Sequence, residues 1–275
     1  MPSKVLLVHV DNNEESGDRV RIAASLANRL GAVLIGSAAA QIQPPIGDPS
    51  GYIDGSLVEL EREDVERELA EAGTQFQQVA GTVQAGTEWR SGIVLPNLAL
   101  AQDARSADLL IIGRSSSDNR GVYRTPSAGD LVMEIGRPLL LVPEGLTELN
   151  LERVLVAWKD TRETRRAVLD ALPLLALAKE VVVLAVRENE DDDEERIGAE
   201  DVSAYLQRHG INSHASCTPL QASSVVDEIL NQADTLNADL IVAGAYGRGR
   251  LREWIFGGVT STLLAQTPKA CLLSH

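Results

Sequence analysis

Short apolar runs alternate with longer segments of helical period along the whole chain. In the first half the runs predict strands over residues 4–10, 32–38, 78–84, 108–113 and 138–142, and the periodic segments predict helices near 16–30, 56–75, 94–106 and 127–136. In the second half the runs predict strands near 152–158, 180–186, 212–218, 239–244 and 269–273. This alternation predicts a parallel sheet with crossover helices. Runs such as 108–113, which are apolar without alternation, indicate that helices cover both faces of the sheet.

The two halves of the chain repeat each other. The sequence SADLLIIG at 106–113 recurs as NADLIVAG at 237–244, 131 residues later. The apolar start at 4–8 corresponds in the same way to 153–157, 149 residues later. A repeat on this scale predicts two related domains in tandem. Each is expected to be an α/β domain built on a five-stranded, parallel, doubly wound sheet.

Composition agrees with two globular domains. The 275 residues divide into expected domains 1–145 and 151–275, and the joint falls in the polar stretch 143–148. The mean hydropathy is −0.05, and no apolar run approaches the roughly 18 residues of a membrane span. The start of the chain has no signal-peptide layout, and Cys217 and Cys271 lie in strand-like runs, so we expect a cytoplasmic protein with reduced thiols. A net charge of −15 argues against nucleic acid or an anionic membrane as the main partner.

A glycine-rich stretch follows the fourth predicted strand of the second half. It runs from Gly244 through Gly247 and Gly249 into a predicted helix that begins near Gly257. Open parallel sheets bind ligands at the carboxyl ends of their strands. Glycines let the backbone approach a phosphate, and a helix start favours an anion. The stretch matches neither a Walker loop nor, at its third position, a dinucleotide fingerprint. A glycine-rich turn that only packs a helix on a sheet is the alternative interpretation.

The spacing of Gly244, Gly247 and Gly257 resembles the G-x2-G-x9-G-[S/T] motif of ATP-binding members of the universal stress protein (UspA-like) family. The strand before the motif, the closing strand 268–273 and the pattern at 10–16 extend the resemblance over essentially the whole chain. It implies a Rossmann-like, adenine nucleotide alpha hydrolase-like fold. It also implies a role in stress response that involves an adenine nucleotide (ATP, ADP or AMP, with Mg²⁺ if a triphosphate). By this resemblance the phosphates would lie near Gly244, Gly247, Arg248, Gly257, Gly258, Val259 and Thr260, and the base would lie between Ala157, Trp158 and Val186.

The two halves depart from the family motif in opposite ways. In the second half, Gly258 stands at the Ser/Thr position and Lys159 at the Asp position that holds adenosine, with Asp160 one residue further on. In the first half, Asp11 keeps the Asp position, but the second and third glycines are Ser116 and Pro126. Because proline has no N–H and a side chain at 116 crowds the loop, we expect the first half to be a structural remnant. The second half is then the better nucleotide site.

Other chemistry finds little support in the sequence. None of the four histidines has metal-ligand spacing, His9 is interpreted as a structural imidazole, and no G-x-S-x-G elbow is present. The acidic run 188–195 is interpreted as a solvated loop. No general base is identifiable, so at most slow ATP hydrolysis is expected. In the family, two domains pair through their final strands, so 139–142 and 270–273 are expected to meet within this chain, and a further homodimer stays open. A ligand-free module that works through partner proteins is the alternative function.

Overall fold

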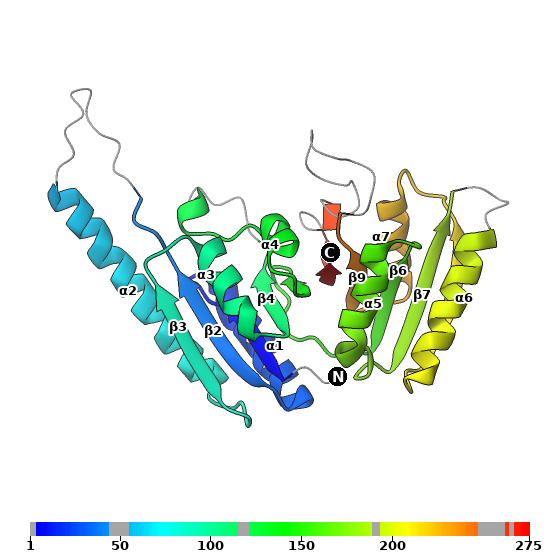
Figure 1. The fold of residues 1–275 in the computed structure, drawn as a ribbon, viewed down its shortest axis with the longest axis horizontal. Helices are drawn as coiled ribbons and strands as arrows, with labels where there is room; N and C mark the ends of the chain where they lie inside the picture. The colour runs from blue at the N-terminus through cyan, green and yellow to red at the C-terminus, as the bar shows by residue number, and fades with distance from the viewer. Residues whose placement is uncertain (1–3, 44–54, 115–120, 189–192, 247–261, 264–266) are drawn as a thin grey trace.

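A computed structural model describes residues 4–43, 55–114, 121–188, 193–246, 262–263 and 267–275. In these residues the two halves share one ten-stranded sheet with helices on both faces (Figure 1). The strand order is β3-β2-β1-β4-β5-β10-β9-β6-β7-β8, and every neighbouring pair is parallel except β5 with β10. The expected fold class, two doubly wound α/β halves in tandem, is confirmed.

The elements of the first half follow the expected alternation. They are β1 (Val5–His9), α1 (Glu14–Leu30), β2 (Val33–Ala39), α2 (Gly55–Ala80), β3 (Thr87–Gly92), α3 (Pro96–Asp103), β4 (Leu109–Gly113), α4 (Ala128–Glu134) and β5 (Leu139–Val142). Two short 3₁₀ turns, Ala104–Ser106 and Gly121–Tyr123, precede β4 and α4.

The second half repeats the scheme in the described residues. Its elements are β6 (Arg153–Trp158), α5 (Arg162–Leu175), β7 (Glu180–Arg187), α6 (Asp193–Arg208), β8 (Ser213–Pro219), α7 (Val225–Thr235), β9 (Leu240–Gly244) and β10 (Ala270–Ser274). Hydroxyl caps fix several helix starts. The side chains of Ser127, Thr161 and Ser224 accept hydrogen bonds from the backbone three residues on, at α4, α5 and α7.

The closing strands of the two halves join them. Leu140 pairs with Leu272 at the centre of the β5–β10 contact, flanked by the pairs Leu141–Cys271 and Leu139–Leu273. All of these residues are buried. The expected intrachain pairing is therefore confirmed, and each closing strand covers the other's open edge.

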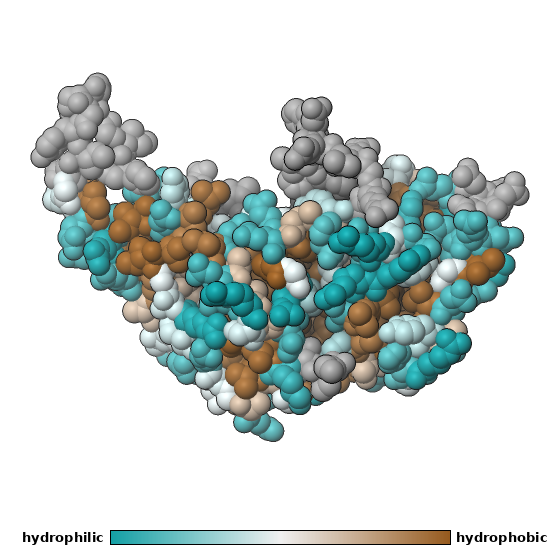
Figure 2. Space-filling view, viewed as in Figure 1, coloured by the Kyte–Doolittle hydropathy of each residue, from teal (hydrophilic) through white to brown (hydrophobic). Residues whose placement is uncertain are grey.

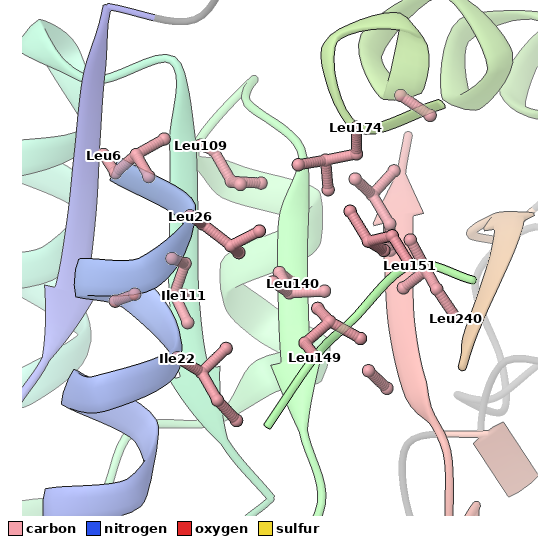
Figure 3. Packing of buried hydrophobic residues seen from close by; sticks show 14 of the residues in the cluster. Leu6, Ile22, Leu26, Leu109, Ile111, Leu140, Leu149, Leu151, Leu174 and Leu240 are labelled. Atoms are coloured by element: carbon pink, nitrogen blue, oxygen red, sulfur yellow. The ribbon is translucent and has the colours of Figure 1, made fainter. Parts of the chain in front are cut away.

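The core lies on both faces of this common sheet. Helices α1, α2, α5 and α6 pack on one face, and α3, α4 and α7 pack on the other. Figure 3 shows the first of these clusters running without a break from Leu26 past Leu140 to Leu240. The connection between the halves also contributes to the core, since Leu149 and Leu151 are buried in the same cluster. The Arg29 side chain donates to the carbonyl oxygens of Leu149 and Asn150, each at 3.1 Å, and holds this connection against α1.

Polar residues predominate on the viewed face of the molecule, and the hydrophobic ones gather at the α2–α3 side of the first half (Figure 2). That half exposes Leu57 and Leu60 on α2 and Leu98 on α3. Within the described residues, no helix combines the length and apolar character that crossing a bilayer requires.

The third strand of the first half was predicted wrongly. Residues 78–80 continue α2, and the strand is Thr87–Gly92 instead of 78–84. The helical period persists because Val65, Ala72, Phe76 and Ala80 form one buried stripe. The strand itself is a half-exposed edge whose Trp89 ring stacks on Phe76 at 5.4 Å between centroids. A short edge strand therefore carries a weaker apolar signal than the helix before it.

The acidic run of the second half was also misassigned in part. Asp193, Glu194 and Glu195 form the first turn of α6 instead of a loop. Carboxylates at a helix start are stabilised by the helix dipole, so local repulsion does not prevent this helix.

Candidate functional site

The two halves make the same pair of hydrogen bonds at the amino ends of their first strands. Asp108 Oδ2 accepts hydrogen bonds from the backbone N–H groups of Lys4 and Val5, at 2.7 and 3.0 Å. Asp239 Oδ2 does the same for Glu152 and Arg153, at 2.5 and 3.1 Å. Residue 4 thus corresponds to 152, a separation of 148 residues, and the separation of 149 read from the sequence was wrong. In this register Asp11 corresponds to Lys159.

At the carboxyl edge of the first half, one buried arginine organises the site. Arg19, on the first turns of α1, is 4% exposed. Its Nε donates to the backbone oxygen of His9 at 2.8 Å, and its Nη2 donates to Ser16 Oγ at 3.3 Å. The same Nη2 lies 3.1 Å from Asp11 Oδ2. We call His9, Asp11, Ser16 and Arg19 the Arg19 cluster.

The electrostatics of the Arg19 cluster follow from burial and this one cation. Burial raises the pKa of Asp11, but the charges of Arg19 and His9 and the N–H of Asn13 outweigh it and hold that pKa below its usual value. Burial lowers the pKa of His9 to about 4, although Asp11 Oδ2 lies 3.6 Å from its Nδ1 and opposes the shift. His9 is therefore neutral at physiological pH, and the Asp11 carboxylate is already neutralised by an ion pair.

The space left at this edge is small. The cavity between the Arg19 cluster, Gly113 and Pro126 amounts to about 30 Å³, whereas a water molecule needs about 10–15 Å³ on such a measure. Arg19 Nη1 lies where a Cβ on residue 113 would stand, so the guanidinium occupies the position above Gly113. A second hollow of similar size lies on the other side of Asp11, beside Arg124. Both hollows are small as the described residues form them.

In the second half the corresponding corner is built differently. Ala167 stands where the first half has Arg19, and the first turn of α5 approaches Gly244 directly. A Cβ on residue 244 would lie 2.6 Å from Thr164 N and 2.7 Å from the backbone carbon of Glu163. Only glycine permits this approach of a helix start to the end of β9. Thr161 Oγ1 caps the turn by accepting from Thr164 N at 3.2 Å.

The residues expected around the base do not share one face of the sheet. Ala157 and Val186 belong to the face covered by α7, whereas Trp158 belongs to the face covered by α5 and α6. Trp158 is buried against Gly198, where a Cβ would lie 2.8 Å from Nε1. Of the expected phosphate residues, Gly244 ends β9 as predicted. Gly247, Arg248, Gly257, Gly258, Val259 and Thr260 lie outside the described residues.

The charged residues after β6 are exposed. Lys159 Nζ lies 3.8 Å from Glu188 Oε1. Both carboxylate oxygens of Asp160 accept hydrogen bonds from Arg165, at 2.7 and 2.8 Å. Asp160 is therefore engaged on the surface, and this pairing argues against its replacing the family Asp.

Sequence reasoning did not identify Arg19 as part of this site. A signal was present, since Arg19 occupies the helical stripe that continues through the buried Ala23 and Leu26. A cation at such a position requires a buried partner. Its partner Asp11 was noted only because it keeps the Asp position of the family motif.

The comparisons with known proteins agree with this fold. A universal stress protein from Archaeoglobus fulgidus DSM 4304 is similar in structure over 100% of this chain and 96% of its own, with a TM-score of 0.72 at 16% identity. A protein of unknown function from Pseudomonas aeruginosa PAO1 is similar over 99% and 92%, with a TM-score of 0.62 at 16% identity. No curated protein sequence matches this chain. The Universal stress protein family profile matches residues 2–143 and again residues 150–275, and the chain therefore belongs to this family, as a tandem of two of its domains.

Proposed function

We propose that this protein binds an adenine nucleotide (ATP, ADP or AMP) in its second half and acts in stress response as a regulator or binding protein. In this proposal the first half is a structural partner. The observation that carries it is the difference between two equivalent corners. Arg19 fills the space above Gly113 in the first half, whereas a helix start lies above Gly244 in the second.

In the first half, the parts that a nucleotide would need are either paired with other groups or replaced. Asp11, the residue that the family resemblance assigns to adenosine, is already paired with Arg19. Ser116 and Pro126 replace two glycines of the phosphate loop. The hollow that the described residues leave beside Arg19 is small.

The second half keeps the glycine spacing and adds features that favour an anion. The motif begins at Gly244, against which the first turn of α5 packs, and a helix start carries partial positive charge. Thr260 supplies a hydroxyl two residues beyond Gly258. With a carboxylate absent at 159, the phosphates contribute more of the affinity than the adenosine does.

Binding, with at most slow hydrolysis, is the activity proposed. A ligand-free interaction module is the second candidate, and it is favoured by Lys159 and Gly258, which depart from the nucleotide-binding pattern. In that case the glycine stretch is kept from the family fold without binding a ligand, and the acidic surface binds partner proteins.

Isothermal titration with ATP, ADP and AMP tests the proposal. The wild type is expected to bind at least one of the three, and Gly247→Val is expected to abolish binding because a branched side chain blocks the phosphate approach. The matched control is Ser116→Val, the equivalent substitution in the first half, which should leave affinity unchanged. Equal and negligible binding by all three proteins would favour the interaction module.

A further inference from the structure

The start of α2 projects past the strands of the first half (Figure 1). α2 has 26 residues, whereas α6, which occupies the same place in the second half, has 16. The first buried residue of α2 is Val65, so residues 55–64 contain no buried side chain. At 1.5 Å per residue this stretch is about 15 Å long. We call residues 55–64 the α2 overhang.

One face of the α2 overhang lies toward the 3₁₀ turn that precedes α4. Arg124 directly follows this turn, and its guanidinium donates to Glu61 Oε1 at 2.5 Å and to Glu68 Oε2 at 2.7 Å. Leu57 precedes Glu61 by one helical turn and therefore shares its face of the helix. Leu57 on α2 and Val122 in the turn are thus brought to the two sides of the same ion pair.

Exposed apolar side chains gather around this ion pair. Among the described residues, eight large apolar side chains are exposed, and six of them lie in the first half. The hydrogen bond from Ser127 N to Asn97 Oδ1, at 2.8 Å, ties the start of α3 to the same connection. Figure 2 shows hydrophobic residues from α2 across to α3. The overhang patch, as we call it, consists of Leu57, Leu60, Ile93, Leu98 and Val122, whose exposed fractions run from 38% at Ile93 to 68% at Val122.

The second half has no such patch in its described residues. Its exposed large apolar side chains there are Leu169 on α5 and Ile197 on α6, which are on separate helices. Single apolar residues are ordinary on a protein surface, whereas a contiguous group marks an interaction surface. The overhang patch is therefore a feature of the first half, and it lies away from the glycine motif.

Charge limits what the overhang patch can bind. Residues 55–68 carry six carboxylates and two arginines, so their net charge is −4. Both arginines pair within the helix, Arg62 with Glu66 and Arg67 with Asp64. A second copy of the chain would bring this acidic segment against itself, and an anionic membrane would be repelled. A cationic partner would be attracted.

We propose that the overhang patch and the acidic face of α2 bind an amphipathic helix of a partner protein whose apolar side is flanked by lysine or arginine. The apolar side of that helix packs on Leu57, Leu60 and Val122. Its cationic flank pairs with Glu59 and Glu63, which are both exposed. A helix laid by its apolar face on a hydrophobic surface is a recurring mode of recognition. This inference goes beyond the proposed function, because it requires no nucleotide and uses the half to which that proposal assigns none.

Binding of two synthetic peptides to the full chain tests this inference. One peptide is an amphipathic helix of leucine and lysine, and the other has glutamate in place of each lysine. Fluorescence anisotropy is expected to show that the wild type binds the Leu/Lys peptide and not the Leu/Glu peptide. Leu57→Ser with Leu60→Ser should lower the affinity about tenfold or more, because two apolar anchors are lost. The matched control, Leu169→Ser with Ile197→Ser, removes two exposed apolar side chains from the second half and should leave the affinity unchanged.

Charge reversal tests the electrostatic part. Glu59→Lys with Glu63→Lys is expected to weaken binding of the Leu/Lys peptide about tenfold and to allow the Leu/Glu peptide to bind. Glu194→Lys with Asp201→Lys makes the same change of charge at exposed positions on α6 and should do neither. Circular dichroism checks that each variant keeps its helix content.

The remaining outcomes overturn the proposal. They are failure of the Leu/Lys peptide to bind, equal binding of both peptides, and an equal loss of affinity in the α6 variants. If sedimentation equilibrium shows a wild-type dimer that Leu57→Ser with Leu60→Ser dissociates, the overhang patch is an interface between copies, and the proposal is again overturned. All of these results are independent of ATP titrations, so failure here leaves the proposed nucleotide site standing.

Discussion

Arg19 Nη2 lies 3.1 Å from Asp11 Oδ2, at the edge of the first half where a nucleotide would enter. This pair converts a potential ligand site into part of the core. It satisfies the one carboxylate that the family motif retains there, and it leaves Arg19 Nη1 above Gly113. The second half has Ala167 at the equivalent position and cannot form such a pair.

Removing Arg19 should therefore destabilise the folded chain. Arg19→Ala leaves Asp11 largely buried without its cation and is expected to lower the free energy of unfolding by about 2–3 kcal/mol. Urea denaturation followed by circular dichroism measures this. Arg21→Ala, which removes an exposed arginine paired with Asp18 on the same helix, is the control and should change stability by less than about 0.5 kcal/mol. An equally small effect of Arg19→Ala would contradict the structural role.

Acid should destabilise the protein through His9. The pKa of His9 is lowered to about 4 in the folded chain from a model-peptide value of 6.5, so below pH 6.5 the unfolded chain takes up a proton that the folded chain does not. The free energy of unfolding should fall by about 3 kcal/mol as the pH falls from 7 to 4 on this account. Asp11, whose pKa is held low, adds to the loss only at still lower pH, as its folded form becomes protonated.

Denaturation at several pH values with His9→Gln checks this prediction. The variant should lose most of the pH dependence between 6.5 and 4. His214→Gln, which replaces an exposed histidine, should keep it. A His9→Gln protein with the wild-type pH profile would refute the assignment.

The two corner glycines should respond differently to the same substitution. At Gly244 an added Cβ meets the backbone of α5 at 2.6 Å, which a small movement cannot relieve. At Gly113 it meets the end of the Arg19 side chain, which can shift. Gly244→Ala is therefore expected to cost about 2–3 kcal/mol and Gly113→Ala about 1 kcal/mol. The control is Gly92→Ala, because the nearest atom to a Cβ there lies 3.7 Å away. Thermal unfolding ranks the stability of the three variants. A larger loss of stability in Gly113→Ala than in Gly244→Ala would be evidence against this packing.

The sequence predicted most strands because a strand buried on both faces must be continuously apolar, as Leu109–Gly113 and Leu240–Gly244 are. It failed for Thr87–Gly92 because an edge strand needs few apolar residues. The contacts of the Arg19 cluster are local, within residues 9–19, but the position of Arg19 above Gly113 could not be predicted because α1 and the end of β4 are far apart in the chain. The same holds for the first turn of α5, which packs against Gly244. Local pattern fixes the elements, whereas these sites depend on which elements the sheet places side by side.

The junction at Leu140 and Leu272 should couple the stability of the two halves. Leu272 is fully buried in a core that both halves share. Leu272→Ala is expected to cost about 2–5 kcal/mol, and hydrogen exchange should show both halves losing protection together. Leu169→Ala, at a half-exposed position on α5, should cost much less. Loss of protection confined to the second half would show that the two domains are energetically independent.

The central claim is that one of two similar domains binds the nucleotide and the other cannot. Its most direct measurement is the stoichiometry of ATP binding by equilibrium dialysis at saturating ligand. We predict one nucleotide per wild-type chain and none per Gly247→Val chain. Two nucleotides per chain, or one that persists in Gly247→Val and is lost in Ser116→Val, would contradict the account.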